Sequence, residues 1–344
     1  MNIVVLCGGL SAERDVSITG GTLVANALRE RGHKVLLMDS FFGCTEQYDK
    51  PEELFLREHK DEVISVGEHE PDLEKVKAQR TQASSSVLGS NVIEICRAAD
   101  IVFLALHGED GENGKLQATF DVHGIKYTGS GYLGSALAMN KSISKELFLQ
   151  GGIRTPRGIT VYADQAPYED VGFPCVVKPC SGGSSVGTSI VRSRDEYDAA
   201  LALAFKYERG VIVEQYISGR ELTCGVIDVN AMPVIEIIPN EGFYDYKNKY
   251  QAGATTELCP APIGEEKTAE VQRLSERVND CLMIDSYCRV DFLMDGEGLL
   301  YCLEANTLPG MTPTSLVPQM AQAQGMSYGE LCDELIAVSM KKYK

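Results

Sequence analysis

Several features that would assign the sequence to a common class of protein are missing from it. It has no run of about 18 apolar residues, so no membrane-spanning helix is expected. Its first residues lack a basic leader and a small-residue cleavage site, so they do not resemble a signal peptide. Lysine and arginine are few, at 32 against 49 acidic residues, and the net charge of −17 argues against a nucleic-acid partner.

Cysteine pairs and two familiar nucleotide-binding motifs are also missing. The eleven cysteines include no C-x-x-C spacing, which argues against a zinc site. Their odd number, and places inside apolar runs such as those of Cys7 and Cys96, favour a reducing cytoplasmic compartment over disulfides. No G-x-G-x-x-G fingerprint follows the first strand, and Thr188 stands where a Walker P-loop requires lysine. A Rossmann dinucleotide site and a Walker P-loop are therefore excluded.

The length and the apolar pattern predict a multidomain α/β protein. At 344 residues the chain is too long for one ordinary hydrophobic core, so two or three domains are expected. An apolar strand at 2–7, a helix that ends near Arg31 and a second strand at 34–38 form a βαβ opening, which predicts a parallel sheet. The expected domains are residues 1–131, 132–216 and 217–344.

The segment from Cys288 to Asn306 carries the strongest functional signal. Two apolar-rich strands flank Asp-Gly-Glu-Gly at 295–298, which predicts a β-hairpin. If its loop holds an even number of residues, side-chain alternation gathers the polar residues on one face. That face carries Arg289, Asp291, Glu304 and Asn306, and the opposite, apolar face carries Val290, Phe292, Met294, Leu299, Tyr301 and Leu303. Oxygen ligands beside an arginine suit Mg²⁺ and an anion. A solvated face with one salt bridge is the alternative, and the Asn-Thr-Leu-Pro-Gly-Met continuation argues against it.

Two lysines and two glutamates occupy positions where a nucleotide could bind. Lys178 ends an apolar strand and precedes a Gly/Ser-rich loop, whose backbone N–H groups suit an anion. A plain hairpin turn is the alternative for this loop. Lys141 begins a helix, where a structural lysine is also common. Glu214 and Glu221 flank the expected boundary between the second and third domains, where ligands often bind, although a lone glutamate at a strand end is usually just solvated.

Taken in order, the motifs resemble those of the ATP-grasp superfamily, and within it the D-alanine–D-alanine ligases. The resemblance covers nearly the whole chain and leaves residues 43–90 as a variable insertion. Each motif alone is weak, but the ordered series is specific. The motifs are Gly8-Gly-x-Ser-x-Glu13, His107-Gly-x-x-Gly111, Tyr127-Thr-Gly-Ser-Gly131, Met139-Asn-Lys141, Val177-Lys-Pro with Gly183-Ser-Ser-Val-Gly187, Tyr244-Asp-Tyr-x-x-Lys-Tyr250, Arg289-Val-Asp291, Glu304-Ala-Asn-Thr-x-Pro-Gly-Met-Thr312 and Ser315-Leu316. Asn140 and Ala118 replace the common Asp and Gly at positions without a catalytic role.

The resemblance implies an ATP-grasp architecture, in which an N-terminal parallel α/β domain is followed by two α+β domains that enclose the nucleotide. It implies ligation of two D-alanines through an acyl phosphate, with ATP, two Mg²⁺ (or Mn²⁺) and a homodimer. The implied ATP-binding residues are Lys141 and Lys178 on the phosphates, Glu214 and the backbone near Tyr216 on adenine, and Glu221 on ribose. The implied metal ligands are Asp291, Glu304 and Asn306.

The resemblance also implies the residues that handle the amino acids. Glu13 would receive the first ammonium in a triad with Ser184 and Tyr250, and Lys249 would meet the γ-phosphate from a lid formed by residues 244–253. The remaining implied residues are Arg289 and Gly310 at the oxyanion, His107 in the substrate site, and Ser315 and Leu316 at the carboxylate of the second substrate.

Three alternatives stay open from the sequence. The second substrate could be D-serine instead of D-alanine, whereas the Lys249-Tyr250 pair argues against D-lactate. Another carboxylate–amine ligase of the same fold would lack the set of Glu13, Ser184 and Tyr250. A non-catalytic nucleotide-binding protein would bind ATP without producing ADP, and the intact metal-ligand set argues against it.

Overall fold

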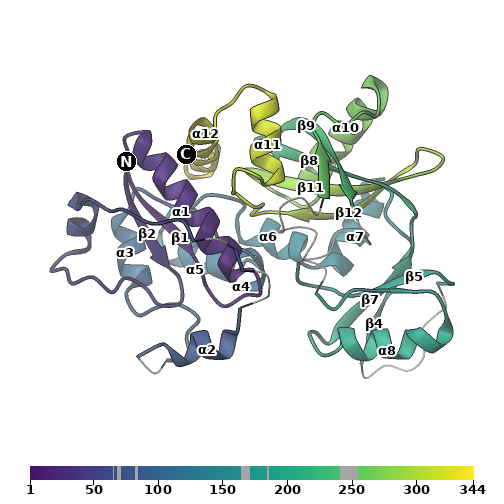
Figure 1. The fold of residues 1–344 in the computed structure, drawn as a ribbon, viewed down its shortest axis with the longest axis horizontal. Coiled ribbons are helices and arrows are strands. Elements are labelled where there is room, and N and C mark those ends of the chain that lie inside the picture. Colours follow the sequence, from purple (N-terminus) through teal and green to yellow (C-terminus); the bar gives the residue numbers. More distant parts are fainter. Residues whose placement is uncertain (65, 68–70, 82–83, 164–170, 184–185, 241–254) are drawn as a thin grey trace.

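The structure is a computed structural model that describes residues 1–344 except 65, 68–70, 82–83, 164–170, 184–185 and 241–254. The strands of the described residues form three separate sheets (Figure 1). The sheet nearest the N-terminus is parallel, and the two that follow are antiparallel. This order confirms the expected α/β class, in which a unit with a parallel sheet is followed by two units that combine helices with antiparallel sheets.

The N-terminal sheet has the strand order β2-β1-β3. Its strands are β1 (Asn2–Cys7), β2 (Lys34–Asp39) and β3 (Ile101–Leu104). Alternate residues of β1 enter two cores, because Val5 packs with α1 whereas Val4 packs with α3 and α5 on the other face. Burial on both faces explains why β1 reads as a continuous apolar run. The helices of this unit are α1 (Arg14–Glu30), η1 (Pro51–Leu56), α2 (Leu73–Ala78), α3 (Val92–Ala98), α4 (Glu109–Glu112) and α5 (Lys115–His123).

Two helices lead from the first unit to the second sheet, which is antiparallel in the order β4-β7-β5-β6. These helices are α6 (Tyr132–Met139) and α7 (Lys141–Gln150). The strands are β4 (Gly158–Tyr162), β5 (Cys175–Pro179), β6 (Ser189–Val191) and β7 (Gly210–Gln215). Helix α8 (Arg194–Ala204) covers one face, where Tyr197 and Ala204 pack on Val177 and Val213.

The third sheet is antiparallel and has the order β10-β9-β8-β11-β12. Its strands are β8 (Gly219–Ile227), β9 (Asn230–Pro239), β10 (Thr255–Leu258), β11 (Tyr287–Asp295) and β12 (Leu300–Asn306). Helix α10 (Glu265–Cys281) covers one face, where Val271 and Val278 pack against Val290 and Phe292. The chain ends with α11 (Leu316–Ala323), α12 (Tyr328–Ser339) and η2 (Met340–Tyr343).

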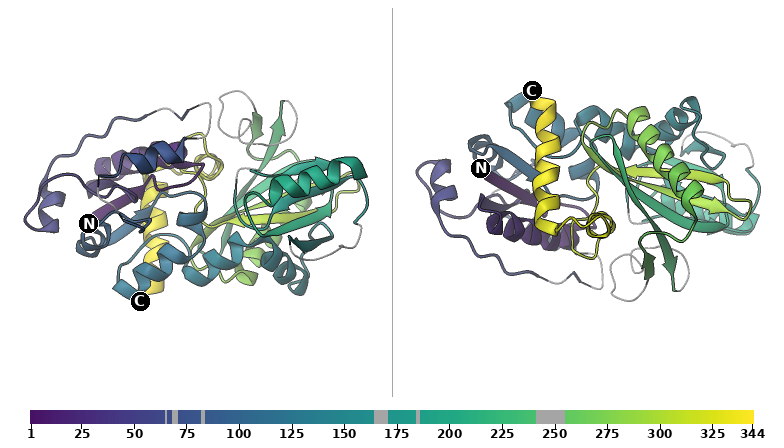
Figure 2. Two further views of the ribbon diagram at one scale, coloured as in Figure 1. Left: turned by 90° about the horizontal axis from the view of Figure 1, so that it is seen from below. Right: turned by 90° about the horizontal axis from the view of Figure 1, so that it is seen from above.

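The last long helix returns to the first unit. Both views in Figure 2 show α12 lying across the elements of the N-terminal unit, and α12 contacts α1. A capping box is present at Ser327 and Glu330, and Leu331 and Leu335 are fully buried. One core therefore contains side chains from β1, α1, β9, α11 and α12. This core fixes the N-terminal unit against the third sheet, so that loops from both meet at the site described below.

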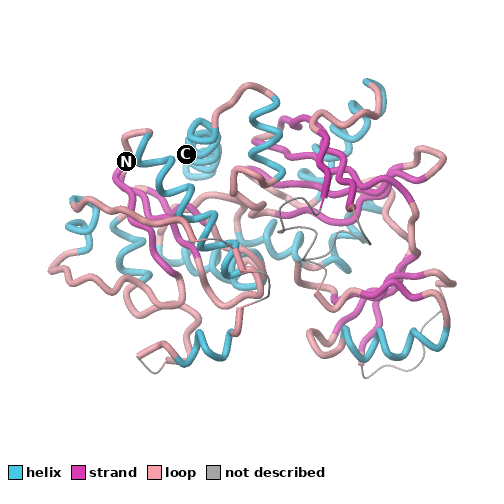
Figure 3. The backbone as a smooth tube through the Cα atoms, in the orientation of Figure 1, coloured by secondary structure: helices cyan, strands magenta, loops and turns pink. Residues whose placement is uncertain are grey.

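The element pattern expected from the sequence is confirmed over most of the described chain. Between β2 and α3, in the segment left as a variable insertion, the described residues form mainly loop with the short helices η1 and α2 (Figure 3). In the described part of the chain, no helix combines the length and the apolar character needed to cross a membrane.

The hairpin of β11 and β12 confirms one expected face and corrects the other. Arg289 pairs with Asn306 and Asp291 pairs with Glu304, so the four polar residues share one face. The register then shifts by one residue between Asp291 and Phe292. Beyond this shift the buried residues of β12 are Leu300 and Cys302. The prediction that Leu299, Tyr301 and Leu303 form the apolar face is therefore wrong, because it assumed an uninterrupted register.

Candidate active site

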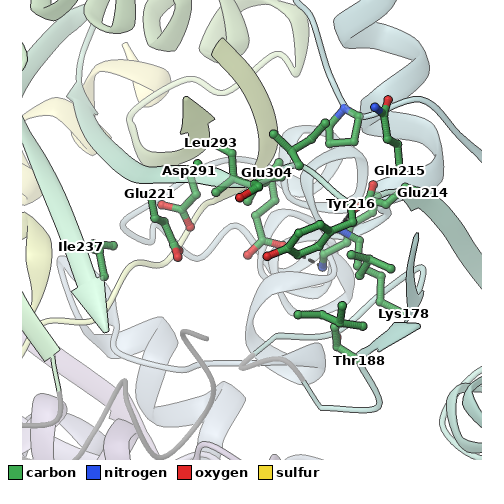
Figure 4. A pocket seen from close by; sticks show the side chains of 18 of the residues that line it. Lys178, Thr188, Glu214, Gln215, Tyr216, Glu221, Ile237, Asp291, Leu293 and Glu304 are labelled. Atoms are coloured by element: carbon green, nitrogen blue, oxygen red, sulfur yellow. Dashed lines mark ion pairs between the residues drawn. The ribbon is translucent and has the colours of Figure 1, made fainter. Parts of the chain in front are cut away.

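A cavity of about 490 Å³ is lined by residues of both antiparallel sheets. Most of the polar residues expected at a nucleotide lie in its wall, and Figure 4 shows several of them pointing into it. They are Lys141 from the start of α7, Lys178 from β5, Glu214 and Tyr216 at the end of β7, Glu221 from β8, Asp291 from β11 and Glu304 from β12. Residues separated by more than 160 positions in the sequence thus share one pocket, between the second and third units.

Lys141 joins the glycine-rich loop to the hairpin. Its Nζ lies 2.9 Å from Glu304 Oε2 and donates to the carbonyl of Gly182 at 2.7 Å. Burial opposes the charge of Lys141, but the ion pair with Glu304 raises its pKa overall. The lysine is therefore a fixed cation at the wall of the cavity.

Glu214 is held between two lysines deeper in the cavity. Lys178 Nζ lies 2.5 Å from Glu214 Oε1, and Lys145 Nζ lies 2.5 Å from Glu214 Oε2. Only 2% of Glu214 is exposed, and burial would favour its neutral form. The two ammonium groups overcome this burial and hold the pKa of Glu214 below its usual range. The carboxylate is therefore ionised, and it can only accept hydrogen bonds.

Asp291 accepts several hydrogen bonds on the polar face of the hairpin. Arg289 donates to both of its oxygens, from Nε at 2.9 Å and Nη2 at 2.8 Å. Thr223 Oγ1 donates at 2.6 Å, and Asn306 Nδ2 donates at 3.1 Å. Four hydrogen bonds thus fix the orientation of this carboxylate, which is itself 7% exposed.

The donor set of the hairpin fits a hard divalent cation. Among the described residues, no three His, Cys, Asp or Glu side chains gather into a ready-made metal centre. Asp291 and Glu304 instead occupy directly paired positions at the cavity wall, with Asn306 hydrogen-bonded to Asp291. Mg²⁺ is commonly held by one or two carboxylates, with phosphate and water oxygens as its other ligands. The oxygens of these three residues suit that arrangement.

A second polar cluster forms where loops of the first unit approach the hairpin. His107 Nδ1 donates to the carbonyl of Leu308 at 3.1 Å, and burial lowers the pKa of this histidine. Glu112 accepts from the backbone N–H of Gly108 at 2.8 Å and from that of Leu308 at 3.3 Å. Burial and the nearby charge of Glu13 raise the pKa of Glu112 to about 8. Glu13 and Arg289 lie close enough to influence both groups electrostatically.

The two clusters are neighbours. A cavity of about 20 Å³ is lined by Glu112 from one cluster and by Lys141, Glu304 and Asn306 from the other. Gly183 also lines the larger cavity, and a Cβ added to it would lie 3.2 Å from a carboxylate oxygen of Glu13. The glycine therefore permits the close approach of the loop to Glu13.

The segment after β12 places the remaining expected residues. Ser315 Oγ lies near Gly310, because a Cβ added to Gly310 would lie 2.9 Å from this oxygen. The same oxygen accepts a hydrogen bond from the backbone N–H of Thr312 at 3.1 Å. Leu316 is 5% exposed at the start of α11. Gln319, one turn further on, donates a hydrogen bond to Glu257. The positive charge of Arg289 is close enough to act on the carboxylate of Glu257. The contact between Gln319 and Glu257 thus places α11, which begins at Leu316, beside β10.

Some predicted site residues lie outside the described residues. They are Ser184, Lys249 and Tyr250, together with the whole of the lid expected at 244–253. Their roles stay predictions.

Three residues of the site were missed by the sequence reasoning. Lys145 follows Lys141 by one helical turn, so the i, i+4 spacing could have placed it on the same face. Glu112 lies in the same polar loop as His107 and carried no separate signal. Thr223 is fully buried and contacts Asp291 from β8, a contact across 68 positions that no local pattern reveals.

Comparison with known proteins agrees with this geometry along the whole chain. The D-ala D-ala ligase N-terminus family matches residues 2–130, and the D-ala D-ala ligase C-terminus family matches residues 160–337. A D-alanine–D-alanine ligase of Pediococcus pentosaceus is 43% identical over 347 residues, covering 100% of this chain and 99% of the relative.

Two solved structures share the fold. The D-alanine–D-alanine ligase of Bacillus anthracis complexed with ATP has a TM-score of 0.76 and 31% identity, covering 99% of this chain and 97% of the other. VanG D-Ala:D-Ser ligase of Enterococcus faecalis has a TM-score of 0.73 and 26% identity, covering 98% and 99%. The polar hairpin, the lysine-lined cavity and the matches over both halves lead to one conclusion. The chain belongs to the D-alanine–D-alanine ligase family.

Proposed function

We propose that this chain joins two D-alanines into D-alanyl-D-alanine and converts ATP to ADP and phosphate, as a step in peptidoglycan precursor synthesis. The observation that carries the proposal is the adjacency of the two clusters. A cavity with two lysines and two paired carboxylates lies next to the second cluster, in which buried His107 is in the electrostatic field of Glu13 and Arg289. A nucleotide and an amino acid can therefore bind side by side.

The larger cavity is the proposed ATP site, and the likeness to a ligase complexed with ATP supports ATP as the nucleotide. Lys141 and Lys178 would grip the α- and β-phosphates, because both ammonium groups lie in its wall. Glu214 and the backbone near Tyr216 would hold adenine, and Glu221 would bind ribose. These residues follow one another around the end of β7 and the start of β8.

Asp291, Glu304 and Asn306 would hold two Mg²⁺, or Mn²⁺ in their place. A bound divalent ion would neutralise charge on the phosphate oxygens. The hydrogen bonds from Arg289 and Thr223 would keep the carboxylate of Asp291 in its orientation, and a bound metal would take the place of another donor on its oxygens.

The second cluster is the proposed amino-acid site. Glu13 would receive the ammonium of the first D-alanine, completed by Ser184 and Tyr250, with His107 beside it. Arg289 and the backbone at Gly310 would stabilise the oxyanion, and Ser315 and Leu316 would bind the carboxylate of the second D-alanine. The neutral form of His107, favoured by its lowered pKa, adds no positive charge that would repel the ammonium.

The chemistry follows from these positions. The first carboxylate attacks the γ-phosphate of ATP and gives an acyl phosphate and ADP. The second amine then attacks the acyl carbon, and phosphate leaves. Charge builds up on phosphoryl oxygens and then on a tetrahedral oxyanion, so fixed cations contribute most of the catalysis. Lys249 and the lid expected at 244–253 would exclude water from the acyl phosphate.

D-serine as the second substrate is the alternative, supported by the likeness to a D-Ala:D-Ser ligase. The test is coupled ADP release by the purified chain with ATP, Mg²⁺ and a panel of D- and L-amino acids. Turnover with D-alanine alone supports the main proposal. Turnover that requires D-serine beside D-alanine favours the alternative, and ADP release without any D-amino acid dependence overturns both.

Three further assignments belong to the same proposal and rest on the family resemblance. We place the enzyme in the cytoplasm, where its nucleotide is found, and we propose a homodimer. We also propose domain boundaries at 1–131, 132–216 and 217–344, with the active site enclosed where the three meet.

A further inference from the structure

The buried lysine behind Glu214 has no role in the proposed mechanism. Lys145 belongs to α7, one turn after Lys141, but it is absent from the wall of the cavity. Its Nζ donates to Glu214 Oε2 at 2.5 Å and to Thr155 Oγ1 at 2.7 Å. The lysine is 7% exposed. Burying an ammonium group is costly, so the structure must use it for its charge or its hydrogen bonds.

Positive charges outnumber negative charges in the ion-pair group formed by Glu214, Lys145 and Lys178. Two ammonium groups, those of Lys145 and Lys178, share one carboxylate in a water-poor place. Burial and the like charge of Lys178 lower the pKa of Lys145, whereas the charge of Glu214 opposes this shift. Glu214 stays ionised because at least one cation remains beside it.

The two lysines differ in what they can do when a nucleotide binds. Lys178 lines the cavity beside the glycine-rich loop, so phosphate oxygens can draw its ammonium away from Glu214. Lys145 lies behind the carboxylate and is anchored on its other side by Thr155. Once Lys178 turns to phosphate, Lys145 is the cation that remains on Glu214.

We propose that Lys145 is a positioning residue that keeps Glu214 ionised and fixed in the nucleotide complex, so that the cavity selects a purine with a 6-amino group over one with a 6-oxo group. This inference rests on the proposed function, since it takes the cavity to be the nucleotide site and Glu214 to face the base.

The selection follows from hydrogen-bond chemistry. An ionised carboxylate has no proton to donate, so it binds the N–H of a 6-amino group and repels the lone pairs of a 6-oxo group. A protonated Glu214 carries one O–H and could donate to the 6-oxo group. Without Lys145, burial would favour that protonated form once Lys178 is engaged with phosphate.

The test is the preference for ATP over inosine triphosphate, which differs from ATP by a 6-oxo group in place of the 6-amino group. Lys145→Met should lower this preference, measured as the ratio of kcat/KM values in ADP or IDP release, by about 10- to 100-fold. In this variant the KM for ATP should also fall as pH rises, because Glu214 then ionises again. Lys145→Arg should restore most of the preference, because it keeps the positive charge.

Matched variants distinguish a specific effect of Lys145 on Glu214 from a general loss of activity or stability. Lys267→Met removes an ammonium from an ion pair with Glu270 outside the cavity, and it should leave the nucleotide preference unchanged. Glu214→Gln should lower the preference as Lys145→Met does, and the double variant should add little to either. An equal loss of ATP and inosine triphosphate turnover in Lys145→Met would overturn the proposal, as would full additivity in the double variant.

The test of Lys145 can fail or succeed independently of the test of the proposed function. The rise in Tm caused by ATP and by inosine triphosphate measures nucleotide binding without turnover, so it applies even if D-alanine is not the substrate. If Lys145→Met does not fold, Thr155→Val tests the anchor instead. A fall in nucleotide preference in that variant supports the proposal, and an unchanged preference contradicts it.

Discussion

Thr223 provides a sharp test of the hairpin as a metal site. Its side chain is fully buried on β8, and its Oγ1 donates to Asp291 Oδ1 at 2.6 Å, the shortest of the four hydrogen bonds to that carboxylate. Thr223→Val keeps the shape of the side chain and removes the donor. A hydrogen bond to a charged group contributes about 1.5–3 kcal/mol, so its loss corresponds to roughly 10- to 100-fold.

The effect should appear as weaker metal binding. Partners that orient a ligand typically change metal affinity by about the same 10- to 100-fold when they are removed. We therefore expect Thr223→Val to raise the Mg²⁺ concentration that gives half-maximal ADP release, at saturating ATP and D-alanine. Thr223→Ser keeps the hydroxyl, and its Mg²⁺ dependence should stay close to that of the unaltered chain.

The Thr223 experiment has a clear refuting result. If Thr223→Val folds with a normal Tm and shows the same Mg²⁺ dependence as Thr223→Ser, then the orientation of Asp291 does not matter for the metal. In that case the polar face of the hairpin is a structural ion-pair network and not a cation site.

Three further predictions concern charge and packing. The pKa of Glu112 is about 8 in the fold against an ordinary 4.5, so the folded chain keeps a proton that the unfolded chain loses. The free energy of unfolding of the unaltered chain should therefore decrease, relative to that of Glu112→Gln, as pH rises from about 5 to 8. Above about pH 8 the difference should stay constant. Denaturant midpoints of the two chains over this pH range measure the effect. Leu335→Ala should cost about 2–5 kcal/mol and lower Tm, because Leu335 is fully buried in the core that joins α12 to the first unit. Ser327→Ala should cost about 1 kcal/mol in denaturant unfolding through loss of the capping box, and Ser327→Asp should recover most of it.

Local patterns in the sequence were enough to predict much of the fold. The apolar run at 2–7 is β1, and the Ser-x-x-Glu pattern at 327–330 is the capping box that begins α12. The shared face of Asp291 and Glu304 also followed from side-chain alternation, and the two residues are directly paired. Alternation failed beyond the register shift at Asp291 and Phe292, because a shift of one residue exchanges the two faces and leaves no mark in the pattern.

The sequence predicted the site residues that occur in recognisable motifs. It did not predict those that belong to the site only through their buried contacts. Lys141, Lys178 and Glu304 stand at strand or helix ends, and all line the cavity. Lys145 and Glu112 act through partners 69 and 196 positions away, in Glu214 and the backbone of Leu308. Such contacts depend on the packing of whole units, so the helical spacing could place Lys145 on the face of Lys141 but could not reveal the partner of either residue.

The central claim is that the paired carboxylates of β11 and β12 hold the metal and nucleotide of a D-alanine ligase. The most direct measurement is D-alanine-dependent ADP release by Glu304→Ala beside the unaltered chain, with folding checked by Tm. The account predicts a loss of at least about 100-fold, the usual effect of removing a group that stabilises transition-state charge. Undiminished turnover in the folded variant would contradict it.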